Sequence, residues 1–176
     1  MKEKIILVIA IAILWSMPAG AAGQGDVAPS WQATNFQGES VSYPELASGK
    51  PTVIIFWASW CSYCKAFMPY LKGIQQEYGV EGVEIVAVNF REDEAEDGDP
   101  DAYIKDTGIT LTAIRDGEDI AAAYGIRNVP GLMVVDSDGI ISYRRGRTNL
   151  PAGQTIAELW DENVRTALDA EYMDGC

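Results

Sequence analysis

Residues 51–65 read PTVIIFWASWCSYCK and carry the strongest structural signal in the chain. Residues 52–58 are apolar and rich in β-branched and aromatic side chains, which predicts a central strand buried on both faces. Residues 64–78 place apolar side chains along one side, which predicts a helix. Cys61 and Cys64 therefore stand where a strand turns into a helix.

The start of that helix gives the two cysteines different chemistry. Cys61 lies at the end where unpaired N–H groups and the helix dipole favour an anion, so its thiol pKa should be lowered and its sulfur exposed. Cys64 lies one turn inside the helix and should be more buried. We therefore assign Cys61 as the residue that forms a mixed disulfide and Cys64 as the residue that resolves it.

Other uses of two cysteines at this spacing are weaker. A structural zinc site needs about four ligands, and the chain has no histidine and only Cys176 as a further cysteine, so no metal is expected. Haem attachment requires a histidine after the second cysteine, where this chain has Lys65. A permanent structural disulfide remains the alternative. Cys176 is the last residue, and we interpret it as part of a frayed tail.

The rest of the chain alternates short strands with helices. The remaining expected elements are a hairpin at residues 36–41, strands at 83–89, 111–115, 132–136 and 140–144, and helices at 101–107, 118–124 and around 157–168. This order implies an α/β fold with a central mixed β-sheet, helices on both faces and an N-terminal β-hairpin.

Composition excludes several classes of function. The chain has 176 residues, enough for one domain, with 26 acidic and 13 basic side chains and a net charge of −13. Such an acidic protein is not expected to bind nucleic acid, which requires a basic face, or anionic lipid. The absence of histidine excludes histidine metal ligands and Ser-His-Asp or Cys-His catalysis.

The first residues are typical of an export signal. Two lysines precede an unbroken apolar run at residues 5–15, and small residues follow Pro18. This is the order of a secretory signal peptide, with an uncleaved membrane anchor as the alternative, and both deliver the domain to a compartment where disulfides form. The expected organisation is a signal peptide or anchor at residues 1–22, a linker at 23–35, the folded domain at 36–172 and a tail at 173–176.

Two clusters of charge occur in the domain. Residues 92–101 carry seven acids in ten positions. We interpret them as a solvated loop rather than a cation site, because their spacing does not fit an EF-hand. Residues 144–147 read Arg-Arg-Gly-Arg, and we interpret them as the solvated end of a hairpin rather than an anion site.

A second motif, YGIRNVPG, lies at residues 124–131. Because a proline cannot donate to a β-ladder, Pro130 should stand at the beginning of the strand that follows. The segment YGIRNVP resembles the cis-proline segment of thioredoxins, and FWASWCSYCK at residues 56–65 is similar to their active-site segment. The lead-in GKP at residues 49–51 and the acidic insertion after the 83–89 strand are similar to the secreted TlpA/ResA-type branch. The resemblance covers about residues 30–170.

The resemblance implies a thioredoxin fold in which Pro130 is cis and faces the cysteine pair. It also implies that the backbone of Val129 pairs with an extended substrate segment. Trp60 borders Cys61 and completes the expected substrate groove. Thiol–disulfide exchange at Cys61 and Cys64 would need no cofactor beyond the cysteine pair.

Two positions depart from the family's pattern. Ile55 stands where thioredoxins carry a buried Asp, and Phe67 stands where the ResA-type pattern places a Glu. A buried acid assists proton transfer at the inner cysteine, so water or Tyr63 would have to serve here. The pair Ser62-Tyr63 replaces Gly-Pro or Glu-Pro, so the redox potential does not follow from the resemblance.

We expect an exported thiol–disulfide oxidoreductase, a reductase of protein disulfides as in cytochrome c maturation, located in the periplasm or on the outer face of the cytoplasmic membrane. Its partners would be protein disulfide clients and a membrane dithiol electron donor, and the chain itself would be a monomer. The alternatives are a Dsb-like disulfide oxidase or isomerase and a redox-inert binding module. A peroxidase is not expected, because Trp57 and Ala58 stand where the Thr of the Thr-x-x-Cys pattern would be.

Overall fold

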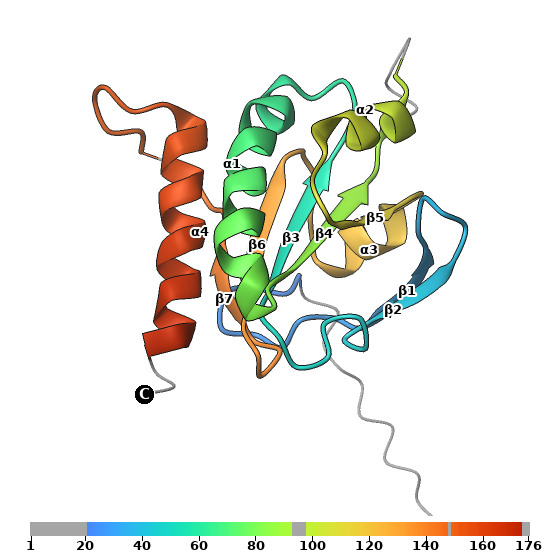
Figure 1. The fold of residues 1–176 in the computed structure, drawn as a ribbon, viewed down its shortest axis with the longest axis horizontal. Coiled ribbons are helices and arrows are strands. Elements are labelled where there is room, and N and C mark those ends of the chain that lie inside the picture. Colours follow the sequence, from blue (N-terminus) through green and yellow to red (C-terminus); the bar gives the residue numbers. More distant parts are fainter. Residues whose placement is uncertain (1–20, 93–97, 148, 174–176) are drawn as a thin grey trace, which may run out of the picture.

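The computed structural model describes residues 21–92, 98–147 and 149–173. Five strands form a central sheet in the order β5-β4-β3-β6-β7, and two more form a separate hairpin (Figure 1). The strands are β1 (Trp31–Thr34), β2 (Ser40–Tyr43), β3 (Thr52–Trp57), β4 (Glu84–Asn89), β5 (Thr112–Ile114), β6 (Gly131–Val135) and β7 (Ile141–Arg144). The helices are α1 (Ser62–Tyr78), α2 (Pro100–Thr107), α3 (Glu118–Ala123) and α4 (Ile156–Met173), with a short 3-10 helix η1 (Gly79–Glu81) after α1.

The central sheet is mixed, as predicted. β3, β4 and β5 run parallel, whereas β6 runs antiparallel to β3 and β7 runs antiparallel to β6. The register places Trp57 beside Asn89 and Phe56 beside Gly131. The carboxyl ends of β3 and β4 and the amino end of β6 therefore meet at one end of the sheet, which lies at the top of Figure 1.

Both faces of the sheet are covered, because side chains alternate along each strand. Val53, Ile55 and Trp57 pack on the side of α1 and α4, which lie next to each other (Figure 1). Ile54 and Phe56 pack on the side of α3 and the β1–β2 hairpin. The predicted α/β architecture with helices on both faces is confirmed.

The N-terminal segment corrects the predicted domain boundary. The hairpin is built from β1 and β2 rather than from residues 36–41, so it begins inside the 23–35 segment predicted as a linker. Val27 also forms an antiparallel bridge with Ile140, far along the chain. Sequence periodicity missed this segment because β1 has only four residues, which alternate between half-buried and exposed.

Residues 1–20, which make up most of the predicted signal peptide or anchor, lie outside the described residues, as does Cys176. Among the residues that are described, no helix combines the length and apolar character needed to span a membrane.

The attachment of the N-terminal segment can be tested at Tyr124, which is fully buried and whose hydroxyl donates a 2.9 Å hydrogen bond to the carbonyl of Pro29. Tyr124→Phe should lower the free energy of unfolding by about 1 kcal/mol, because this carbonyl loses its donor. Urea denaturation measures the difference. Tyr70→Phe is the control, since no hydrogen bond of the Tyr70 hydroxyl is found in the described part of the chain. Equal destabilisation of both variants would contradict the attachment.

Candidate active site

The two cysteines lie at the start of α1 and form a disulfide, with their Cα atoms 5.3 Å apart. Cys61 is the N-cap residue: its backbone is extended, and its sulfur accepts a 3.1 Å hydrogen bond from the backbone N–H of Cys64. This contact occupies one of the N–H groups that a helix leaves unpaired in its first turn. Cys61 therefore sits at the positive end of the helix dipole, although the helix begins two residues before the predicted start.

The exposed fractions of the two cysteine residues differ less than predicted. Cys61 is 3% exposed and Cys64 is fully buried. In the disulfide form both belong to the core cluster beneath α1, against which Val129 also packs. The expectation of an exposed Cys61 is therefore wrong for the oxidised protein. The position at the helix end still distinguishes the two cysteines.

A groove of 660 Å³ lies beside the pair. Its lining includes Tyr63 from the Cys-Ser-Tyr-Cys turn together with Val129 and Pro130. The Val129–Pro130 peptide is cis, as the resemblance implies, and Pro130 directly precedes β6. The structure thus brings the second sequence motif next to the first.

Trp60, which was predicted to complete the substrate groove, is exposed but lies outside this lining. Its indole N–H donates a 2.7 Å hydrogen bond to the carbonyl of Arg91, just after β4, so the ring is held toward that strand. The tryptophan that lines the groove is Trp160 of α4. Its ring contacts those of Tyr63 and Phe67 edge-on, at centroid distances of 6.4 and 6.0 Å. The sequence placed Trp160 on the apolar stripe of the last helix but did not show which part of the domain that stripe covers.

Both positions that depart from the family pattern are part of the apolar core. Ile55 and Phe67 are fully buried. A carboxylate nevertheless reaches the active-site turn from another direction, because Glu92 accepts hydrogen bonds from the backbone and hydroxyl of Ser59 and from the side chain of Asn89. The bonds from the Ser59 hydroxyl and from Asn89 measure 2.7 and 2.6 Å.

Sequence analysis missed that Glu92 lies at the candidate site, since this residue was assigned with the acidic run to a solvated loop. Residues 93–97 of that run lie outside the described residues, but Glu92 is half-buried. It reaches Ser59 because both residues follow neighbouring parallel strands, whose carboxyl ends meet. The meeting of the carboxyl ends of parallel strands could have predicted this contact from the sequence. The prediction would have required knowing that β3 and β4 are paired.

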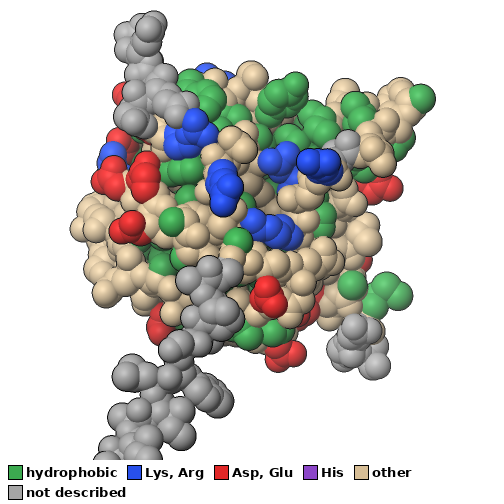
Figure 2. All heavy atoms as spheres, turned by 180° about the vertical axis from the view of Figure 1, so that it is seen from behind, with side chains coloured by type: hydrophobic (Ala, Val, Ile, Leu, Met, Phe, Trp, Pro, Cys, Tyr) green, Lys and Arg blue, Asp and Glu red, His purple; other side chains and the backbone are tan. Residues whose placement is uncertain are grey.

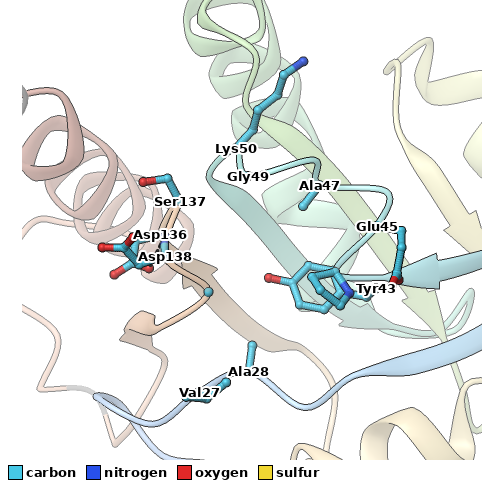
Figure 3. A pocket seen from close by; sticks show the side chains of 12 residues that line it. Val27, Ala28, Tyr43, Glu45, Ala47, Gly49, Lys50, Asp136, Ser137 and Asp138 are labelled. Carbon is cyan, nitrogen blue, oxygen red and sulfur yellow. Dashed lines mark hydrogen bonds between the residues drawn. The ribbon is translucent and has the colours of Figure 1, made fainter.

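A second hollow, of 360 Å³, lies at the opposite end of β3 (Figure 3). Tyr43, Lys50 and Asp136 are among its lining residues. The Asp136 carboxylate is already used within its own turn, where it accepts from the N–H groups of Asp138 and Ile140. No cysteine lines this hollow, and no group of metal-ligating side chains is found among the described residues. The redox-active candidates, Cys61 and Cys64, lie at the other end of the sheet.

Comparison with known proteins agrees with this geometry. The profile of the AhpC/TSA family matches residues 24–144. The chain belongs to the AhpC/TSA family. The chain is 29% identical over 148 residues to the thiol-disulfide oxidoreductase ResA of Halalkalibacterium halodurans. The aligned part covers 80% of this chain and 82% of that protein. It is 25% identical to the thiol:disulfide interchange protein DsbE of Escherichia coli K12, covering 94% of each.

Comparison with solved structures shows which fold the chain has. The thioredoxin domain of a thiol-disulfide oxidoreductase from Bacteroides vulgatus superposes with a TM-score of 0.63 at 22% identity, covering 84% of this chain and 96% of that one. The AhpC/TSA member described here therefore has a thioredoxin fold. It is a thiol–disulfide oxidoreductase of the ResA/DsbE type, with its cysteine pair at Cys61 and Cys64.

The influence of Glu92 can be measured through the thiol of Cys61 in the reduced protein. A negative charge near a thiol raises its pKa, and Glu92 is bonded to Ser59, two residues before Cys61. Glu92→Gln should therefore lower the pKa of Cys61, read from the pH dependence of its alkylation rate. Glu84→Gln removes the same charge at the other end of β4 and should leave this pKa in place. An unchanged pKa in Glu92→Gln, or the same shift in both variants, would argue against the influence.

Proposed function

We propose that this protein is an exported reductase of protein disulfides that acts through Cys61 and Cys64. The observation that carries the proposal is the cysteine pair at the N-terminus of α1, beside a groove lined by Tyr63, Val129 and Pro130. No loop or turn hydrogen bond of the Val129 backbone is found among the described residues. This supports the pairing of Val129 with an extended client segment, in the manner of strand addition.

The proposed reaction has two steps and needs no cofactor. The Cys61 thiolate attacks one sulfur of the client disulfide, forming a Cys61–client mixed disulfide and releasing the other client sulfur as a thiolate, which takes up a proton. Cys64 then loses its proton and attacks the sulfur of Cys61. The mixed disulfide breaks, the second client thiolate is released and protonated, and the Cys61–Cys64 disulfide remains. Two electrons have passed to the client, and a dithiol partner must return two to the cysteine pair.

The direction of electron flow follows from two opposing effects on the thiolate. The helix dipole at Cys61 stabilises the thiolate and hence the reduced protein, which makes the disulfide more oxidising. The Glu92 carboxylate, hydrogen-bonded to the active-site turn, and the net charge of −13 disfavour the thiolate. Lys65, the cation next to Cys64, lies 5.4 Å from the ring centre of Tyr103. Arg145 and Arg147, which line the groove beside the pair, act in the same direction as the helix dipole. We infer that Glu92 and the net negative charge outweigh these cations and the dipole, so that the protein donates electrons.

The site of action follows from the N-terminal sequence. The apolar run at residues 5–15 supports export to the periplasm, or anchoring on the outer face of the cytoplasmic membrane. In that compartment a membrane dithiol protein would supply the electrons, and the monomeric domain would reduce client proteins. The resemblance to the TlpA/ResA-type branch supports cytochrome c maturation as the process served.

Single cysteine variants test the proposal. Cys64→Ser should accumulate mixed disulfides with client proteins or small thiols through Cys61, because the resolving thiol is missing. Cys61→Ser should trap nothing. The wild type should accelerate the reduction of insulin by dithiothreitol, and both variants should fall to the uncatalysed rate.

Two results would contradict this proposal. Trapping through Cys64 in the Cys61→Ser variant would reverse the roles of the cysteines. A wild type no faster than the uncatalysed reaction would favour a redox-inert binding module.

A further inference from the structure

The basic segment at residues 144–147 is only partly the solvated hairpin end that the sequence predicts: Arg147 is exposed, whereas Arg144 and Arg145 are half-buried. Arg144 is used structurally: its guanidinium donates 2.8 Å hydrogen bonds to the carbonyls of Ala22 and Tyr124. Arg145 and Arg147 instead line the groove that contains Tyr63 and Pro130. Two arginines therefore border the site where a client would bind.

Arg145 is held in an unusual environment for a cation. Its guanidinium carbon lies 5.1 Å from the ring centre of Trp160, whose side chain is 2% exposed. The Nε of Arg145 and the indole nitrogen of Trp160 are both buried, and no acceptor for either is found among the residues that the structure describes. No ion pair or side-chain hydrogen bond of Arg145 is found in the described residues, and burial lowers the pKa of its guanidinium.

Within the described ranges, Arg145 has no carboxylate partner. A half-buried arginine is normally paired, because removing a charge from water is unfavourable unless an opposite charge compensates. The chain has 26 acids against 13 bases, yet none of the described acids pairs with Arg145. By contrast, Arg115 and Arg165 each form ion pairs with carboxylates.

The charges are also separated over the surface. Figure 2 shows basic side chains gathered with hydrophobic ones on the face turned away in Figure 1, while acids lie mainly toward its margins. A carboxylate on a client would be repelled by most of this acidic protein. It would be attracted where Arg145 and Arg147 lie, so charge complementarity favours an acidic occupant of the groove.

We propose that the groove selects extended client segments that carry an Asp or Glu beside the cysteine to be reduced. The client carboxylate accepts hydrogen bonds from the Arg145 guanidinium, with Arg147 as a second cation. The apolar side chains of the client pack on Leu150 and Ile156, which also line the groove. This inference rests on the proposed reductase function and adds the class of client.

The test uses two peptides that differ only in Glu or Gln beside a single cysteine, each joined by a disulfide to uncharged 2-mercaptoethanol. The reduced wild-type protein should release the Glu peptide thiol about tenfold faster than the Gln peptide thiol, the size expected for one charge-assisted hydrogen bond. Arg145→Gln should make the two rates nearly equal, and Arg145→Lys should restore part of the preference. Because the preference is a ratio measured on one protein sample, partial unfolding of a variant does not affect it.

Arg115→Gln is the matched control, since Arg115 follows β5 at the opposite edge of the sheet from Arg145. It should keep the full preference for the Glu peptide. Equal rates for the two peptides with wild type, or an unchanged preference in Arg145→Gln, would overturn the inference.

Failure of the underlying function gives a different result, namely that neither peptide is reduced by any of the proteins. In that case binding of the same peptides, with serine in place of cysteine, to the oxidised protein decides the matter. A preference for the Glu peptide that is lost in Arg145→Gln supports the inference, and equal binding overturns it.

Discussion

The burial of β3 on both faces is the constraint on which the rest of the structure depends. Every residue from Thr52 to Trp57 is fully buried, and the strand pairs with β4 on one side and β6 on the other. Hydrophobic burial of such a strand fixes its register with both neighbours. Its last residue therefore has a fixed position relative to the ends of β4 and β6, and the turn into α1 carries Cys61 to that place.

The same constraint explains how distant residues reach one site. The parallel partner β4 brings Glu92 to the backbone of Ser59, and the antiparallel partner β6 brings Pro130 to the groove beside the cysteine turn. α4, packed against α1, adds Trp160 to the groove. None of these contacts requires unusual local sequence, because each follows from how the strands and helices pair.

Local sequence therefore predicted the parts of the site that lie within one stretch of chain. The buried strand and the cysteine pair at the start of a helix were recognisable from periodicity and from the physics of helix ends. The cis form of the Val129–Pro130 peptide came from resemblance, because proline chemistry alone does not specify it. Glu92, Arg145 and the segment around Val27 were assigned to solvated loops or a linker. Their partners lie far away in sequence, and hydrophobic periodicity carries no information on such pairings.

The central claim is that the Glu92 carboxylate and the net negative charge of the protein outweigh the helix dipole and the cations near Cys61, and make the protein an electron donor. The most direct measurement is the reduction potential of the Cys61–Cys64 pair, obtained from the oxidised fraction in glutathione or dithiothreitol buffers. The account predicts a potential more negative than about −180 mV, the value for protein disulfide isomerase. A potential near about −120 mV, that of the strong oxidant DsbA, would contradict it and favour a disulfide oxidase.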